Sequence, residues 1–487
     1  MRILYLDIDT LRADHLGCYG YHRNTSPNID RLAREGVIFD QCYVTDAPCL
    51  PSRTALWSGR CGFHTGVVGH GGSAADPIIE GAPRGFQDIF HATSWISALR
   101  RAGFHTVTVS PFGERHGAWQ WYAGYKEIYN PGKGGMERGD EVFPIALDWI
   151  RRNAQKDNWF LHVNFWDPHT PYRTPLEFGN PFEGDPLPSW LTEEVRQRCW
   201  DGFGPHSAQE PGGWGDERFH EIYPRVPKQI DSMDAVKQWI DGYDVGIRYA
   251  DDFVGKILNA LADAGVLDDT IIMVSSDHGE NQGEFNVWGD HQTADLPTCR
   301  IPLIVRWPGL TDGGRVHRGL IHHYDWAATL VELAGGTVPD NWDAQPFTEA
   351  FRNGEEFSRP YLVTSQNAWS CQRGVRFGDY LLLHTYHDGY KEMEPIMLFN
   401  VAEDPHEQHD LAAERPDLVN QGLALLSQWY REMALTSQHN TDPMLTVLRE
   451  GGPFHTRGML PAYLERLRAT GRAHHAERLA RLHPDEL

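Results

Sequence analysis

The chain has 487 residues, of which 40% are hydrophobic and 23% charged, and its formal net charge is −23. This composition is typical of a globular enzyme with one large domain plus a smaller one, or with two or three modest domains. The negative charge argues against nucleic acid or an anionic membrane surface as a partner, because both would repel the protein.

The N-terminal run "MRILYLDID" predicts a first core strand, because Asp7 and Asp9 interrupt its apolar residues too early for a signal peptide. No stretch has the length and apolarity of a transmembrane helix. The seven cysteines are an odd, scattered set without a CxxC pair, which argues against a disulfide framework and a structural zinc site. We therefore expect a cytoplasmic, bacterial-type protein with no membrane partner.

Strands and helices alternate along the first part of the chain. The segment "SPNIDRLAREGVIF" has helical spacing, and "SWISALRRAGFHTVTVS" is predicted as a helix followed by a strand. Further strands are predicted in "NWFLHVNFWDP", "TIIMVSS" and "RIPLIVRWPG", and further helices in "YDVGIRYADDFVGKILNALADAG" and "HHYDWAATLVELAG". This alternation predicts an α/β fold with a large doubly wound mixed sheet sandwiched by helices.

The composition changes twice along the chain. Residues 1–355 are predicted to form the α/β domain, with a Pro-, Gly- and Trp-rich insertion at 175–235 that would cover the sheet as a lid. Residues 356–435 are predicted to form a small C-terminal β-rich α+β subdomain. Residues 436–487 form a helical tail, either a docking helix or a contact for a homo-oligomer.

Four residues at predicted strand ends suggest a metal site. Asp7 and Asp9 are two apart on one strand, so their carboxylates share a face and would repel each other without a cation. Asp277 and His278 follow the strand "TIIMVSS". Ligands bind outside the carboxyl ends of strands in such sheets, so these residues can converge on Ca²⁺, Mg²⁺ or Mn²⁺. A capping role for one aspartate and a structural turn at Asp277 are the plain alternatives.

Several cationic or imidazole side chains lie on loops beyond strand ends. Such groups stabilise the negative charge that develops in phosphoryl or sulfuryl transfer. The candidates are Arg53, Arg115, His116, His169 and His291, with His64 and His70 as further residues that could line a pocket. Each one alone is more often a surface or packing residue, because the chain has 25 histidines.

Six segments resemble those of the type I sulfatases, a family of the alkaline-phosphatase-like superfamily. The most specific is "CLPSRTALWSGR", which begins at Cys49 and resembles the Cys-x-Pro-Ser-Arg signature of the family. The others are "ILYLDIDTLRADHLGCYGY", "DPHTPY", "VSSDHGE", "RIPLIVRWPG" and "LFNVAEDPHEQHDLA". Together they cover most of residues 1–415.

The resemblance implies a sulfate monoester hydrolase whose nucleophile is a formylglycine hydrate made from Cys49 by a maturation enzyme. It implies a divalent metal, Ca²⁺ before Mn²⁺ or Mg²⁺, held by Asp9, Asp277, His278 and the modified Cys49. Arg53 would orient the hydrate, and His169 would lie near the leaving oxygen as a general-acid candidate. Arg115 and His116 would correspond to the basic pair that helps release the ester.

Three positions depart from the family pattern. The first metal segment reads Asp7-Ile8-Asp9-Thr10 instead of carrying adjacent aspartates, so either Asp7 completes the metal site or the site has one acid fewer. His291 stands where the family commonly has a lysine, which predicts a weaker, pH-dependent sulfate clamp. The segment "GERHGAW" replaces the usual "GKWH" around Arg115 and His116.

Other functions stay open at this level. A phosphonate monoester or phosphodiester hydrolase would use the same nucleophile, and the signature does not separate it from a sulfatase. A metal-binding scaffold without catalysis is disfavoured by the complete set of motif residues, and a phosphatase or phosphomutase by the cysteine. The substrate is expected to be a small sulfated sugar or another small organic sulfate. Trp190, Trp200 and Trp214 of the insertion would either stack on sugar rings or pack on their own aromatic neighbours.

Overall fold

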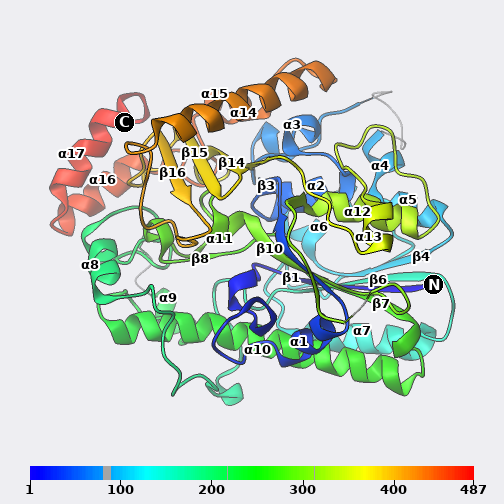
Figure 1. Ribbon diagram of the computed structural model, residues 1–487. Coiled ribbons are helices and arrows are strands. Elements are labelled where there is room, and N and C mark those ends of the chain that lie inside the picture. Colours follow the sequence, from blue (N-terminus) through cyan, green and yellow to red (C-terminus); the bar gives the residue numbers. More distant parts are fainter. Residues whose placement is uncertain (81–88, 216–217, 312) are drawn as a thin grey trace.

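The computed structural model describes residues 1–80, 89–215, 218–311 and 313–487, and its elements are labelled in Figure 1. Nine strands form a mixed sheet. In spatial order they are β11 (Arg315–His317), β2 (Val37–Tyr43), β10 (Arg300–Arg306), β7 (Thr270–Ser275), β1 (Arg2–Ile8), β6 (Trp159–Phe165), β4 (His105–Val109) and β5 (Glu127–Tyr129), with β12 (Ile321–His322) also paired to β2. The predicted mixed sheet of an α/β fold is confirmed.

The direction of the central strands determines where the functional residues meet. β1 pairs in parallel with both β6 and β7, and β4 pairs in parallel with β6. The exception is β10, which runs antiparallel between β7 and β2. The carboxyl ends of β1, β6 and β7 therefore lie at one edge of the sheet, where the loops that follow them carry the candidate site residues.

Strand β1 shows how the sheet divides two helical layers. Leu4, Leu6 and Ile8 pack with one set of helices, while Ile3 and Tyr5 pack on the opposite face. The first face is covered by α1 (Pro27–Arg34), α7 (Gly139–Asn153) and α10 (Met233–Asp263). The other is covered by α2 (Cys49–Ser58), α5 (Trp95–Arg101), α12 (His323–Leu333) and α13 (Thr348–Asn353). The alternation of a strand places Asp7 on the face of Ile3 and Tyr5, toward α2.

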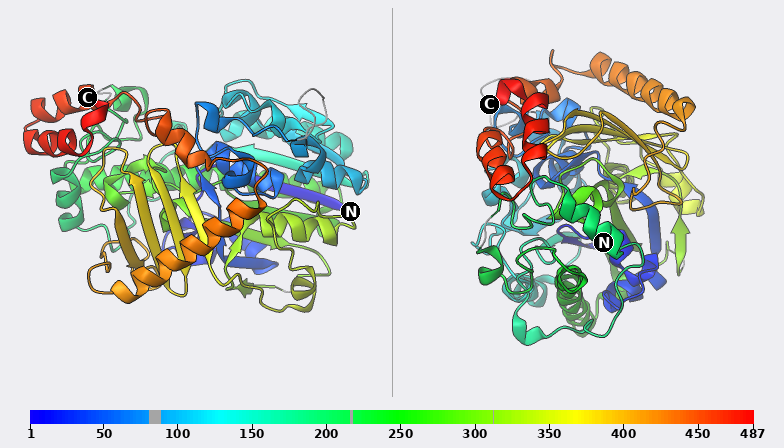
Figure 2. Two further views of the ribbon diagram at one scale, coloured as in Figure 1. Left: turned by 90° about the horizontal axis from the view of Figure 1, so that it is seen from above. Right: turned by 90° about the vertical axis from the view of Figure 1, so that its left-hand side faces the viewer.

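A second sheet has the order β16 (Ile396–Asn400), β15 (Tyr380–His387), β14 (Cys371–Phe377), β13 (Leu362–Gln366) and β3 (Asp46–Ala47). Helix α14 (Pro416–Thr436) packs across one face of this sheet (Figure 2). The edge strand β3 comes from the N-terminal part of the chain and pairs in parallel with β13. The second sheet therefore holds the segment directly ahead of Cys49.

The remaining α-helices and strands of the first 450 residues are short. They are α3 (Gly62–Thr65), α4 (Ile89–Thr93), α6 (Phe112–Arg115), α8 (Glu193–Asp201), α9 (Phe219–Ile222), β8 (Asn281–Gln282), β9 (Trp288–Asp290), α11 (Leu296–Cys299) and α15 (Pro443–Arg449). Helices α8 and α9 lie in the predicted insertion, and residues 216–217 of that insertion are outside the described residues. All seven cysteines are free thiols.

The end of the tail differs from the single amphipathic helix that its sequence suggests. The segment forms two helices, α16 (Leu460–Ala469) and α17 (Ala473–Leu482), because Gly471 adopts a positive φ of 80° between them. Tyr463 and Leu464 of α16 pack with Phe203 and Tyr390, so the tail docks on the chain itself. None of the helices in the described part combines the length and apolarity needed to cross a lipid bilayer.

Candidate active site

Cys49 is the first residue of α2 and is 1% exposed. The Ser52 hydroxyl, one turn further along the helix, donates a 2.5 Å hydrogen bond to the Asp277 carbonyl and so ties α2 to the end of β7. Burial, with Asp9 and Asp277 nearby, raises the pKa of the Cys49 thiol well above its usual value. The unmodified side chain is therefore a poor nucleophile, although the helix N-terminus beside it favours an anionic ligand.

Arg53 lies among three buried carboxylates. Its Nε and Nη2 donate to Asp7 Oδ2 at 3.1 and 2.9 Å, and its Nη1 donates to Asp9 Oδ2 at 3.0 Å. Nη1 also donates to Asp277. Burial raises the pKa of Asp277 to about 6, even though Arg53 acts in the opposite direction. One guanidinium does not neutralise three carboxylates, so the site has the charge that suits a divalent cation.

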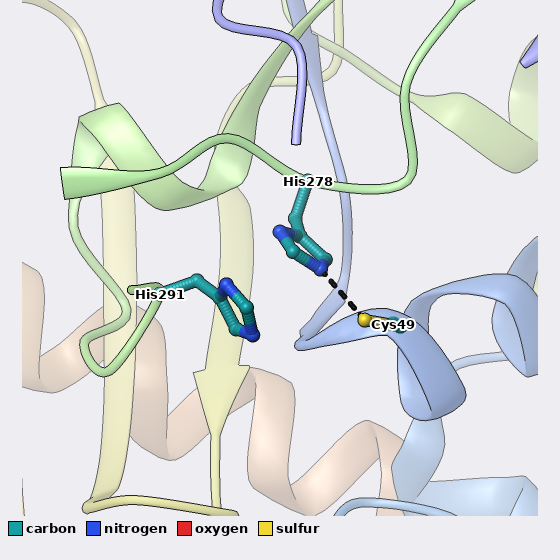
Figure 3. A group of neighbouring side chains, drawn as sticks. All are labelled: Cys49, His278 and His291. Atoms are coloured by element: carbon teal, nitrogen blue, oxygen red, sulfur yellow. Dashed lines mark hydrogen bonds between the residues drawn. The ribbon is translucent and has the colours of Figure 1, made fainter. Parts of the chain in front are cut away.

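Four side chains are placed to bind such a cation. Ligand atoms of Asp9, Cys49, Asp277 and His278 all lie within 4.8 Å of one another. Asp9 Oδ1 is buried without a hydrogen-bond partner, so it has an unused lone pair. His278 Nδ1 donates to the Gly279 carbonyl at 2.7 Å, which leaves the Nε2 lone pair directed at Cys49 Sγ, 3.1 Å away (Figure 3). The donor set fits a metal ion.

Asp7 is a further buried carboxylate beside this group and contacts Arg53. Besides Arg53, its Oδ2 accepts a 3.2 Å hydrogen bond from His162 on β6, whose Nδ1 accepts from Thr108. Burial raises the pKa of Asp7, but Arg53 and His162 outweigh it and the net shift is downward. Oδ1 of Asp7 is buried and has no hydrogen-bond partner. Asp7 is thus a charged partner of Arg53 that retains one free carboxylate oxygen.

Three further imidazoles approach Cys49. Nitrogens of His70 and His116 lie within 4.8 Å of Cys49 Sγ, and so does a nitrogen of His291. The His291 and His278 rings are 4.1 Å apart between centroids (Figure 3). Burial, followed by neighbouring cationic groups, lowers the pKa of His70, His116 and His291 well below the usual value. The three rings therefore surround the sulfur as neutral groups at neutral pH.

His169 and Arg115 extend this wall. The His169 ring meets the His291 ring edge-on at 5.6 Å, and burial together with Arg115 lowers its pKa. Nδ1 of His169 donates to the Thr170 carbonyl, so Nε2 carries the lone pair. The Arg115 guanidinium lies 5.0 Å from the centroid of the Trp166 ring. The structure thus brings together the predicted residues at 7, 9, 49, 53, 70, 115, 116, 169, 277, 278 and 291.

Three residues that the sequence did not indicate, His455, Trp369 and Gln366, support this wall. His455, in the tail, lies with Nε2 3.0 Å from Nδ1 of His70, and its ring stacks on Trp369 at 4.7 Å. Trp369 follows Gln366, whose side chain donates to the His291 carbonyl at 2.8 Å. Nothing near His455 in sequence marks it as functional. His162 was not predicted either, although a polar residue in the apolar strand β6 is a signal that could have indicated it.

Comparison with known proteins identifies the family. Residues 2–336 match the family described as Sulfatase, and residues 283–424 match the one described as N-sulphoglucosamine sulphohydrolase, C-terminal. The first match covers more than half of the chain. The chain belongs to the sulfatase family. It is therefore a hydrolase of sulfuric esters, and the sulfatase family in general implies a metal ion and a formylglycine.

Individual relatives are distant but cover most of the chain. An N-acetylglucosamine-6-O-sulfatase of Bacteroides thetaiotaomicron is 22% identical over 92% of this chain and 89% of its own length. A structure solved in complex with its substrate D-glucosamine-2-N,6-O-disulfate matches with a TM-score of 0.70 at 18% identity, covering 91% of this chain and 99% of that one. A phosphonate monoester hydrolase of Silicibacter pomeroyi matches with a TM-score of 0.66 at 19% identity, covering 92% and 97%. These structural likenesses show the shared fold.

One predicted pocket residue of this sulfatase has a different role. Nδ1 of His64 lies 2.8 Å from Asp343, and its Nε2 lies 3.1 Å from the Met433 carbonyl and 3.0 Å from the Thr436 hydroxyl. Nε2 thus fastens α14 to α3, and Nδ1 fastens the segment around Asp343 to α3. The structure gives His64 a structural role and leaves it no free nitrogen for a substrate.

The tryptophans of the insertion pack mainly on other aromatic groups of the sulfatase. Trp190 stacks on His406 at 4.2 Å, and Trp214 contacts Trp369, Tyr390 and Tyr463 at 5.3–6.4 Å. Trp200 packs against the main core. Of the two alternatives for these rings, the structure favours aromatic packing, here against residues of the C-terminal part of the chain, over a platform for sugar rings.

A lysine beside the sulfatase site makes stability depend on pH. Burial lowers the pKa of Lys391 to about 7, and the side chain is only 3% exposed. Because the unfolded chain keeps this proton up to about pH 10, the native state should gain stability as the pH rises from 7 to 9.5. We expect Lys391→Met to be more stable than the wild type at pH 7 and to lose most of this advantage at pH 9.5. Urea unfolding at the two pH values measures this; an advantage that does not change with pH contradicts it.

Proposed function

We propose that this sulfatase hydrolyses sulfate monoesters of small sulfated sugars, using a formylglycine hydrate derived from Cys49 and a bound Ca²⁺. The observation that carries the proposal is the position of Cys49 at the N-terminus of α2, with ligand atoms of Asp9, Asp277 and His278 within 4.8 Å. Two of the proteins described above, the N-acetylglucosamine-6-O-sulfatase and the protein solved with D-glucosamine-2-N,6-O-disulfate, act on sulfated sugars according to their printed descriptions, which supports this class of substrate. A maturation enzyme that recognises Cys49, Pro51 and Arg53 would supply the modification.

Each residue has a role that follows from its contacts. Asp9, Asp277 and His278 would hold the cation, and the free oxygen of Asp7 is the further candidate ligand. When bound, the cation and the aldehyde hydrate supply a metal-polarised hydroxyl as nucleophile. Arg53 forms ion pairs with Asp7 at 2.9 Å and with Asp9 at 3.0 Å, and it helps to lower the pKa of Asp7, since an opposite charge at this distance favours the anionic form.

The imidazoles would act on the ester itself. His70, His116 and His291 surround the position of the modified side chain, and each can donate a hydrogen bond from a ring N–H to a sulfate oxygen. His169 is neutral in the free protein and must first take up a proton to protonate the leaving oxygen. An anionic ester beside it favours that uptake. Arg115 adds a fixed positive charge to the same wall.

A phosphonate monoester hydrolase is the second candidate, because a protein of that name shares the fold at a TM-score of 0.66. Paired assays on phenyl sulfate and on a phenyl phosphonate monoester separate the two. We expect kcat/KM to be higher for the sulfate in the matured protein with Ca²⁺. A large excess for the phosphonate would overturn the sulfatase proposal in favour of the alternative.

A further inference from the structure

A basic cavity lies beside the candidate active site. It has a volume of about 310 Å³ and is enclosed by the start of α7, the segment after His169 and the segment after α9. Its charged lining residues are Lys133, Arg138, Glu141, Arg173 and Arg225. Four cations and one carboxylate are an unusual local balance in a chain with a net charge of −23.

Two of these arginines lack a carboxylate partner. Arg173 and Arg225 form no ion pair among the residues that the structure describes, whereas Lys133 pairs with Glu141 and Arg138 with Asp140. Arg225 is 9% exposed and donates only to the carbonyls of Thr174 and Pro175, at 2.6 and 2.5 Å. Nε of Arg173 is buried and has no hydrogen-bond partner among the described residues. Burial lowers the pKa of both guanidiniums, and the carboxylates that act in the opposite direction, Asp167 on Arg173 and Glu177 on Arg225, form no ion pair with them. Desolvation that no direct ion pair offsets favours a bound anion.

Arg173 connects the cavity to the reacting centre. Its Nη2 donates to the His169 carbonyl at 3.3 Å, and its Nη1 donates to the Gly135 carbonyl at 3.1 Å. Arg115, whose positive charge acts on the Cys49 thiol, donates to the neighbouring Gly134 carbonyl at 3.1 Å. Gly135 has a φ of 86°, and a Cβ there would lie 2.5 Å from Arg115 Cδ, so this close passage requires glycine. One short loop thus holds both arginines.

We propose that this cavity binds a second anionic group, a sulfate or a carboxylate, carried by the leaving group of the ester. The inference rests on the proposed function, since it assigns the substrate side of that same site. Guanidinium groups bind planar or tetrahedral oxyanions through paired hydrogen bonds. Arg173 and Arg225 both line the cavity and carry such groups. The preferred substrate is therefore a sulfate ester with at least two negative charges.

Three aryl esters test this preference. They are 3-carboxyphenyl sulfate, benzene-1,3-diyl disulfate and the neutral analogue 3-carbamoylphenyl sulfate. We expect the matured wild type to have a kcat/KM for one or both charged esters ~10-fold above that for the neutral one, as one ionic hydrogen bond provides. The better charged ester identifies the group that the cavity prefers. Equal values, or a preference for the neutral ester, would overturn the proposal.

Variants locate the effect. Arg225→Gln should lower the ratio of charged to neutral kcat/KM by ~10-fold, and Lys133→Gln should lower it in the same direction because it leaves Glu141 unpaired. Arg248→Gln, on the surface of α10, removes the same charge and should not change the ratio. If Arg225→Gln and Arg248→Gln reduce the ratio equally, the effect of charge acts at long range, and the proposal that the cavity binds the second anionic group is wrong.

Two further measurements separate a failure of the cavity proposal from a folding defect and from a failure of the proposed function. If Arg225→Gln has a lower melting temperature, the more exposed Lys133→Gln decides the comparison. If the matured protein hydrolyses no sulfate ester, the proposed function fails. The cavity is then judged by calorimetric binding of 3-carboxyphenyl sulfate: weaker binding to Arg225→Gln than to the wild type supports it, and equal binding overturns it.

Discussion

Replacing Cys49 by alanine is expected to lower kcat/KM for an aryl sulfate by at least ~10⁴-fold, as the loss of a nucleophile does in other hydrolases. The side chain is buried at the start of α2, so alanine can take its place without disturbing the helix. The melting temperature should therefore change little. Steady-state kinetics on phenyl sulfate, together with thermal unfolding, measure the two effects separately.

Cys42 provides the matched control. It is also fully buried, on β2, and lies away from the group of metal-ligating side chains. Cys42→Ala should keep its activity within a few-fold of the wild type. If Cys49→Ala retains activity comparable to that of Cys42→Ala, the reaction does not use Cys49 and the proposed mechanism is wrong.

Arg53→Met is expected to lower the free energy of unfolding by about 3–5 kcal/mol in the presence of a chelator, because it leaves three buried carboxylates without their cation. It should also abolish detectable activity. Added Ca²⁺ binds only the native state and supplies a counter-charge to the same carboxylates, so it should restore part of the lost stability. Urea unfolding with chelator and with Ca²⁺ gives both values.

Arg12→Met is a matched control for this experiment. Arg12 is equally buried and pairs with Asp14 and Glu284, outside the group of metal-ligating side chains. Its replacement should cost stability as well, but Ca²⁺ should stabilise this variant no more than it stabilises the wild type. If Ca²⁺ restores Arg12→Met and Arg53→Met equally, the carboxylates around Arg53 are not the metal site.

Much of the fold and site follows from local patterns. The alternating strands and helices predicted the mixed sheet, and the two-residue spacing of Asp7 and Asp9 predicted a shared face, where both carboxylates in fact contact Arg53 of α2. Strand ends then predicted that Asp7, Asp9, Asp277 and His278 can converge, and the resemblance to the sulfatases added Cys49 to them. These features depend on periodicity and on the geometry of parallel strands, both of which are visible in sequence.

The remaining features depend on long-range packing. His455 reaches His70 from the tail across 385 positions, and no local pattern indicates such a contact. Strand β3 joins the second sheet rather than the first, which only pairing with β13 determines. The sequence suggested His64 as a pocket residue. Its contacts with Asp343 and with Met433 of α14 give it a structural role instead. Nothing in the sequence indicated Arg173. Only the structure shows that it donates to backbone carbonyls and forms no ion pair among the described residues.

The mass of one tryptic peptide tests the central claim most directly. Cleavage after Arg34 and Arg53 releases residues 35–53, which contain Cys42 and Cys49. In an active sample, we predict an aldehyde at position 49 and one alkylatable thiol, that of Cys42, with the extent of conversion proportional to kcat. An active sample in which this peptide carries two alkylatable thiols and no aldehyde would contradict the account.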